Sequence, residues 1–322
     1  MTGRETEPLV SVVVPTFNRP AALRAAAESV NAQTYDSIQL IVVDDSTTPA
    51  EAALTGLDLD AIAEIHFIRS ANPQGAAAAR NRGIAAADGA YVAFLDDDDR
   101  WDPEKIEKQV EAFETAAADV GVVYTGQRYV DGAGNTTTIR TPTTQGWVTE
   151  QLLAGAPLAP FSTVMVRAAA IEDAGTIDER FPIWEDREWY LRLSTVCQFL
   201  AVPEPLVIRT MGDHGQLSSD FARIQDVSYP LFLDTHAPLA ASYGMERQFE
   251  ASMARMLAVA ALDTGHYAAA RRASMRAIRA EPTNKTAWVY LVLSLGGRVT
   301  YRLAQSVKRR ISTAQASNST SP

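Results

Sequence analysis

Short apolar runs alternate with longer amphipathic stretches through the first 125 positions of the chain. Each run has the length of a strand, and most stop at a proline, an aspartate or a glycine. This alternation predicts a doubly wound, mostly parallel α/β sheet flanked by helices, in which the carboxyl ends of the strands share one edge. The expected strands are 9–14, 38–43, 64–69, 90–95 and 120–125, and the expected helices are 20–32, 75–87 and 103–117.

The pattern changes after Tyr124. The glycine-containing segment 131–135 separates two β-branched stretches and predicts a hairpin. Beyond it we expect a strand at 163–167, a helix at 184–196 and a last strand at 206–209.

The end of the chain has no strand pattern from about residue 221. Residues 262–291 resemble one tetratricopeptide-type helical hairpin, with small residues where two helices approach. We therefore expect an α/β domain over 1–220 and an all-helical region over 221–322. Because one hairpin cannot bury its own apolar face, we expect it to pack on the α/β domain.

Charge excludes one class of function and divides the chain. The 322 residues hold 39 acids and 29 bases, so a general nucleic-acid binder is not expected. Residues 1–220 hold 33 acids and 16 bases, a net of -17, whereas residues 221–322 hold 6 acids and 13 bases, a net of +7. Two regions of opposite charge are expected to meet different partners.

The location of the protein is expected to be cytoplasmic, with peripheral membrane contact left open. Cys197 is the one cysteine, so no intrachain disulfide can form. The N-terminus lacks the apolar run of a signal peptide, and no 18 consecutive residues are apolar.

Four consecutive carboxyl groups, Asp96 to Asp99, follow the strand expected at 90–95. Alternate residues of an extended segment point the same way, so Asp96 and Asp98 can converge on one hard divalent ion while Asp97 points elsewhere. Mg²⁺ or Mn²⁺, shared with substrate phosphates, is the expected ion. The alternative is a solvated acidic turn before the next helix, with Asp102 as its N-cap.

Polar residues also follow the first two expected strands. The loop Pro15-Thr16-Phe17-Asn18-Arg19 lies where open α/β sheets bind nucleotides, and no GxGxxG motif is present to favour a dinucleotide. Asp44 and Asp45 end the second strand and can accept from a base or a ribose. Arg80 and Arg82 bring positive charge that a pyrophosphate needs, although surface salt bridges are an equal alternative.

Two further segments carry candidate chemistry. Glu185 and Asp186 open a helix after Trp184, and Asp186 can accept a proton from an attacking hydroxyl. The flanking aromatic residues Phe181, Trp184 and Trp189 can stack on a sugar ring, or any one of them can belong to the core. The alternative is that both acids only stabilise the helix dipole. His214, in a glycine-bracketed loop, can complete a metal site, contact a diphosphate, or be structural.

Together these segments resemble glycosyltransferase family 2, the inverting enzymes with the GT-A nucleotide-sugar fold. The residues that carry the resemblance span about 9–220 and comprise VSVVVPTFNR, IVVDDS, GAAAARNRGIAAADGAYVAFLDDDDRWDPEKIE, FPIWEDREWYLRL and DHGQLS. The resemblance implies that Pro15, Phe17 and Arg19 line the nucleotide pocket, that Asp44 or Asp45 binds the base, that Asp96 and Asp98 hold metal and diphosphate, and that Asp186 is the base. Four acids stand where the family often has Asp-x-Asp-Asp, which blurs the roles of Asp97 and Asp98.

The resemblance implies transfer of a sugar from a nucleoside diphosphate, with UDP expected first and GDP or dTDP as alternatives, to a glycan or lipid-linked saccharide. A sugar-phosphate nucleotidyltransferase would show a glycine-rich loop after the first strand, and PTFNRP has no glycine. A non-catalytic nucleotide-sugar-binding scaffold would not need both the acid cluster and Asp186. Basic residues at 271–279 and 308–310 suggest contact with an anionic membrane, and a solvated helix face is the alternative.

Overall fold

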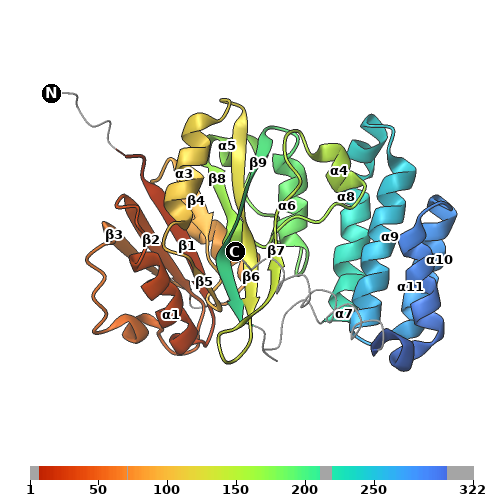
Figure 1. Ribbon diagram of the computed structural model, residues 1–322, viewed down its shortest axis with the longest axis horizontal. Helices are drawn as coiled ribbons and strands as arrows, with labels where there is room; N and C mark the ends of the chain where they lie inside the picture. The colour runs from red at the N-terminus through yellow and green to blue at the C-terminus, as the bar shows by residue number, and fades with distance from the viewer. Residues whose placement is uncertain (1–6, 71, 211–219, 303–322) are drawn as a thin grey trace, which may run out of the picture. The chain divides into compact units, whose positions relative to one another are not determined.

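The computed structural model describes residues 7–70, 72–210 and 220–302 (Figure 1). The chain forms two compact units. The first comprises Met1–Val148, Leu158–Glu179 and Glu185–Met211, and the second comprises Thr149–Pro157, Arg180–Trp184 and Gly212–Pro322.

The first unit is built on one sheet that is parallel in its first half and mixed in its second. Among the described residues the strand order is β3-β2-β1-β4-β8-β6-β9-β5, with β7 paired to β6. β1 runs parallel to β2 and β4, and β2 to β3, whereas β8 lies antiparallel to both β4 and β6. The predicted mostly parallel α/β sheet is therefore confirmed. The strands are β1 (Val10–Thr16), β2 (Ile38–Asp44), β3 (Glu64–Arg69), β4 (Tyr91–Phe94), β5 (Asp99–Trp101), β6 (Val120–Val130), β7 (Thr136–Arg140), β8 (Val164–Arg167) and β9 (Gln198–Thr210).

Helices cover both faces of this sheet because its strands are apolar on both sides. Val12 and its alternate neighbours share one core cluster with Leu23 of α1 (Pro20–Asn31) and Ile106 of α3 (Lys105–Thr115). The opposite face carries Val13, against which α2 (Ala76–Ala85) packs, and Phe94. Phe94 meets the indole of Trp189 on α6 (Glu185–Leu193) edge-on, with 5.5 Å between the ring centroids. A short helix, α5 (Ala168–Ala174), follows β8.

Several elements differ from the expectations. β9 is 13 residues long and begins eight residues before the expected strand. The sequence pattern missed its first part because Pro203 and Pro205 interrupt the apolar run. The prediction that Asp102 is the N-cap of this helix was wrong, because α3 begins at Lys105 and its N-cap is Glu104. The Asp102 carboxylate instead accepts a hydrogen bond from Arg128 at 3.1 Å. The hairpin is confirmed, since β6 and β7 pair antiparallel around 131–135.

Among the residues described, the regular elements of the second unit are all helices. Its elements are α4 (Thr149–Leu153), α7 (Phe221–Arg223), a π-helical turn (Ile224–Ser228), α8 (Tyr229–Ser242), α9 (Glu246–Asp263), α10 (Tyr267–Ala280) and α11 (Lys285–Leu295). Ala254, Ala277 and Ala287 form a small core where α9, α10 and α11 approach one another. Within the described ranges, no helix combines the length and the apolar character that crossing a bilayer requires.

The contact between α2 and β1 gives a test of the fold. A Cβ added at Gly83 would lie 2.2 Å from Val13 Cγ1, and a β-branched side chain has little freedom to move away. We expect Gly83→Ala to lower the free energy of unfolding by about 1–3 kcal/mol, although alanine is the better helix former by about 1 kcal/mol. Urea unfolding measures the change. The control is Gly132→Ala, where nothing lies within 4 Å and the free energy should change by less than about 0.5 kcal/mol.

Candidate active site

The polar residues singled out in the sequence gather at one edge of the sheet in the first unit. β1 lies between β2 and β4, and all three run parallel, so their carboxyl ends point the same way. This is the edge at which open α/β sheets bind ligands. The residues at or just after these ends are Thr16 to Arg19 on β1, Asp44 and Asp45 on β2, and Asp96 to Asp99 after β4.

Asp97 turns toward β1, away from its neighbours in the acid run. Its carboxylate accepts a hydrogen bond from Thr16 Oγ1 at 2.8 Å and forms an ion pair with Arg19 at 3.2 Å. Burial raises the pKa of Asp97, and the contacts with Thr16 and Arg19 oppose that rise. Asp97 therefore anchors the loop after β1 to the end of β4.

The other three acids of the run lie together. One carboxylate oxygen of each of Asp96, Asp98 and Asp99 lies within 4.8 Å of the others, a spacing suited to a shared cation. Asp98 is the most exposed of the three and also pairs with Arg19 at 3.2 Å. Oxygen-only donors of this kind fit a hard divalent ion such as Mg²⁺ or Mn²⁺.

Asp99 was not among the residues expected in this cluster. It is the first residue of β5, and its carboxylate accepts from Ser162 Oγ at 2.7 Å and from Arg209 Nε at 3.0 Å. Burial raises the pKa of Asp99 to about 7, and Arg209 opposes the rise. Through these two contacts with protein side chains, Asp99 holds the acid cluster in place and connects it to the end of β9.

Arg80 links the acid cluster to α6. Its guanidinium donates to Asp96 Oδ1 at 2.6 Å and to Glu185 Oε1 at 3.1 Å, and it lies 4.1 Å from the centroid of the Phe161 ring. Only 6% of Arg80 is exposed. Burial alone would lower the pKa of Arg80, but Asp96 and Glu185 raise it. A fixed positive charge therefore lies between the strand end and the helix start.

Glu185 and Asp186 form the first turn of α6 and approach the cluster through Arg80. Burial raises the pKa of Glu185 to about 7, with Arg80 opposing the rise and Asp186 adding to it. Burial also raises the pKa of Asp186, while the backbone N–H of Arg187, which donates to Asp186 Oδ1 at 2.7 Å, lowers it. A carboxylate with a raised pKa is a better proton acceptor near neutral pH than an ordinary aspartate.

Tyr190, one helical turn after Asp186, was not expected to contribute. Its hydroxyl is buried and has no hydrogen-bond partner among the described residues. Burial raises the pKa of Tyr190, and the charge of Asp186 adds to the rise. A neutral phenol thus stands beside the carboxylates of α6.

At the end of β2, the two acids have different surroundings. Asp44 accepts hydrogen bonds from the backbone N–H groups of Ser46, at 2.9 Å, and Ala50, at 2.7 Å, so it shapes its own loop. Asp45 forms an ion pair with Arg82. Arg82 therefore neutralises the charge of Asp45 at the end of β2, whereas Arg80 pairs with Asp96 in the acid cluster.

The other candidate residues lie in or next to β1, in the second unit, or outside the described residues. Pro15 is part of β1, and Phe17 in the following loop is 51% exposed, available to a planar ligand. Trp184 belongs to the second unit and has a left-handed backbone, with φ 72°. His214 lies outside the described residues.

The family model of glycosyl transferase family 2 matches residues 11–169, which include the ends of β1, β2 and β4. An uncharacterised glycosyltransferase of Nostoc sp. is 37% identical over 187 residues, which are 55% of this chain and 56% of that protein.

A second relative and a solved structure extend the likeness. The Escherichia coli UDP-Glc:alpha-D-GlcNAc-diphosphoundecaprenol beta-1,3-glucosyltransferase WfaP is 37% identical over 107 residues, 33% of this chain and 42% of that protein. The mannosyltransferase PcManGT of Pyrobaculum calidifontis, solved with GDP-Man and Mn²⁺, has a TM-score of 0.56 at 17% identity over 95% of this chain and 88% of its own.

The chain spans about half the length of the curated relatives that it matches. The structural likeness is at the level of the fold, which is of the GT-A type with a helical C-terminal region. Through residues 11–169, the chain belongs to glycosyl transferase family 2.

Proposed function

We propose that the protein is an inverting glycosyltransferase that moves a sugar from a nucleoside diphosphate to a hydroxyl of a glycan or lipid-linked saccharide. The proposal rests on the contacts of Arg80 with Asp96 and with Glu185. These contacts link the acid cluster, which would bind a metal ion and the donor diphosphate, to α6, where burial raises the pKa of the proposed base Asp186. The two parts that a transfer reaction needs are thereby held at one sheet edge.

The donor side of the proposal rests on the loops after β1 and β2. Pro15, Phe17 and Arg19 would line the nucleotide pocket, with the exposed Phe17 ring against the base and Asp44 or Asp45 receiving its N–H groups. Asp96 and Asp98 would hold Mn²⁺ or Mg²⁺, which when bound neutralises charge on the leaving diphosphate. UDP is the expected nucleotide, in line with the UDP-Glc named for WfaP, and GDP is the alternative, as named for PcManGT.

The transfer itself is a single displacement. The acceptor oxygen forms a bond to the anomeric carbon, the bond from that carbon to the diphosphate oxygen breaks, and the electron pair leaves with the nucleoside diphosphate. Asp186 takes the proton of the acceptor hydroxyl. Arg80 acts as a positioning residue, because it contacts Asp96 and Glu185 and holds the charge between them. Trp184 and Glu185 are proposed to face the acceptor.

We place this reaction at the cytoplasmic face of the cell membrane. The support is the printed acceptor of WfaP, a saccharide carried on diphosphoundecaprenol, together with the excess of basic residues after position 220. A lipid-linked acceptor requires an enzyme that can work next to a bilayer.

Nucleotide binding gives the first test. In a thermal-shift panel of UDP, GDP and dTDP with and without Mn²⁺, the cognate nucleotide at about 100 times its Kd should add ~2.7 kcal/mol, or roughly 5–10 °C in Tm. Asp98→Asn should lose the Mn²⁺-dependent part of this shift, whereas Asp60→Asn, at an exposed loop carboxylate, should keep it. Absence of any shift with the unaltered protein would favour a different function.

The pH dependence of transfer tests the base. Asp186 must be deprotonated to accept a proton, so activity should fall as the pH drops through its pKa. Because burial raises that pKa above 3.8, the acid limb of kcat/KM should lie at a higher pH than for an ordinary aspartate. Asp186→Asn should reduce kcat by about 10²–10⁴-fold while leaving nucleotide binding intact. A variant that retains full activity would remove Asp186 from the mechanism.

Arg80 gives a separate prediction. Its charge lowers the pKa of Glu185 and Asp186, so Arg80→Gln should move the acid limb of kcat/KM upward by about one pH unit. Arg80→Lys keeps the charge and should move the limb less. Circular dichroism and urea unfolding of both variants separate this effect from misfolding, and an unchanged limb in a folded Arg80→Gln variant would contradict the positioning role.

A further inference from the structure

The helix α11 exposes a stripe of apolar side chains. Trp288, Val292 and Leu295 stand at positions i, i+4 and i+7 and are 49%, 64% and 65% exposed, and Val289 beside them is 53% exposed. Val299, in the helical residues after the break at Gly296 and Gly297, is 69% exposed as well. Adjacent exposed apolar groups of this kind mark an interaction surface.

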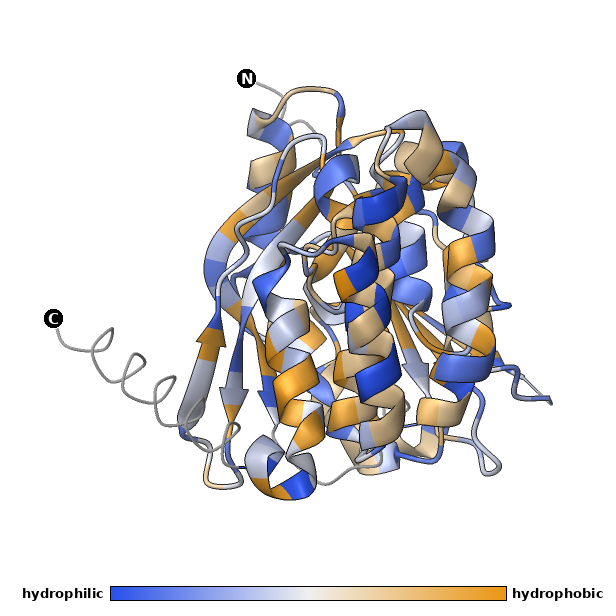
Figure 2. Ribbon diagram, turned by 90° about the vertical axis from the view of Figure 1, so that its right-hand side faces the viewer, coloured by the Kyte–Doolittle hydropathy of each residue, from blue (hydrophilic) through white to orange (hydrophobic). Residues whose placement is uncertain are grey.

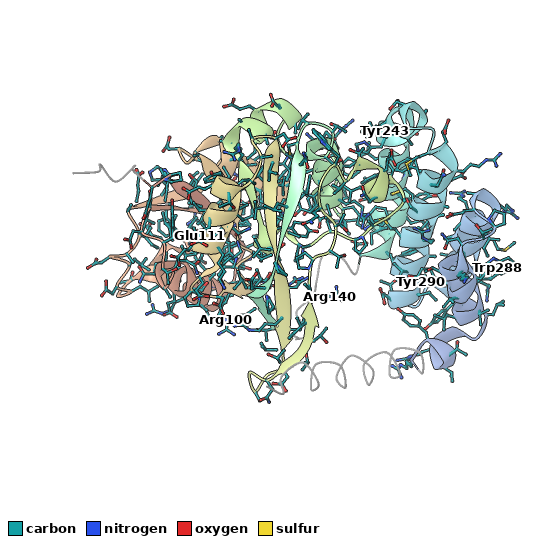
Figure 3. The ribbon with its side chains drawn as sticks, turned by 45° about the horizontal axis from the view of Figure 1, so that its top comes forward. Arg100, Glu111, Arg140, Tyr243, Trp288 and Tyr290 are labelled. Carbon is teal, nitrogen blue, oxygen red and sulfur yellow. The ribbon has the colours of Figure 1, made fainter. Side chains whose placement is uncertain are left out.

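The packing of the hairpin explains why the described residues of the second unit leave this face of α11 exposed. Ala287 and Ser294, on the other side of α11, are fully buried, and Ala287 packs with Ala254 and Ala277. Because α11 uses these small residues to pack on its neighbours, its larger apolar residues point outward. Figure 2 shows hydrophobic turns along α11, and Figure 3 places Trp288 at the edge of the helical unit.

Cations flank the stripe. Lys285 precedes it, and Arg298 and Arg302 follow, all three exposed and without an ion pair within the described residues. From Gly265 to Arg302 the sequence has seven basic residues against one acid, Glu281, and Glu281 is paired with Arg255. The stripe is thus apolar, with exposed cations before and after it in the chain, in a part of the sequence that has few acids.

We propose that this face of α11 docks on an anionic lipid bilayer, with Trp288, Val289, Val292, Leu295 and Val299 entering the interface and the cations meeting headgroups. Amphipathic helices with apolar centres and basic flanks bind in this way, and tryptophan favours the boundary between acyl chains and water. The exposed cations at both ends of the stripe would repel the same surface of a second copy. None of these residues is among those proposed to carry out glycosyl transfer.

Vesicle sedimentation with the full chain tests the proposal. We expect binding to vesicles of phosphatidylcholine with phosphatidylglycerol, not to phosphatidylcholine alone, and weaker binding as salt rises. Val292→Asp should reduce binding at least ~10-fold. Val227→Asp, the same change at a 42% exposed valine outside α11, should reduce it less than about twofold. Lys285→Gln with Arg298→Gln should cost about fivefold per cation and flatten the salt dependence.

A second measurement locates the contact. Vesicles with brominated acyl chains should quench part of the tryptophan fluorescence, and Trp288→Phe should lose that quenching while still sedimenting with the vesicles. Equal binding by Val292→Asp and the unaltered protein, or unchanged quenching in Trp288→Phe, overturns the proposal. The proposal is also overturned if the protein is a dimer, and Val292→Asp dissociates the dimer without changing vesicle binding. That result would assign this face of α11 to a contact with a second copy. The nucleotide thermal shift of each variant should be unchanged, so failure here is distinct from failure of the proposed function.

Discussion

The arrangement of the site depends on one buried cation among several carboxyl groups. Asp96, Glu185 and Asp186 would repel one another if brought together alone, and burial raises the pKa of Glu185 and of Asp186. Arg80 offsets that repulsion, and the face of Phe161 lies against its guanidinium. A buried ion network of this kind adds little net stability, but removal of one member is costly. Its effect is to fix where the end of β4 and the start of α6 lie relative to each other.

The same logic separates the acids of the run by role. Asp97 is satisfied by Thr16 and Arg19, and Asp99 by Ser162 and Arg209, so their charges are committed to protein partners. Asp98 is the more open carboxylate of the run. Four adjacent aspartates that look equivalent in the sequence thus differ in burial and in partners. Because of this difference, Asp97 and Asp99 can connect the run to other strands while Asp98 still presents carboxylate oxygens to a ligand.

Sequence patterns were sufficient wherever the cause was local. The strand ends predicted the shared edge, and Asp97 does turn away from Asp96 and Asp98 as expected. The reason differs from the expected extended segment, because residues 97 and 98 form a turn in which the Asp99 N–H donates to the Asp96 carbonyl at 3.0 Å. The patterns failed where partners are distant in the chain. Nothing near Asp99 indicates Ser162 or Arg209, and no spacing rule tells that Arg80 pairs with Asp96 whereas Arg82 pairs with Asp45. The first part of β9 was also missed, because its prolines interrupt the apolar pattern and its place in the sheet comes from pairing with the distant β6.

Charge gives the two parts of the chain opposite preferences at an anionic surface. The net of -17 over residues 1–220 would be repelled by anionic lipid, while the net of +7 over residues 221–322 would be attracted. Both forces fall off within about 10 Å at ordinary salt, so charge can orient an approaching molecule but holds it weakly. Apolar groups hold at contact and are insensitive to screening. An exposed apolar stripe in the basic part of the chain therefore adds what charge alone lacks, an attachment that persists in salt.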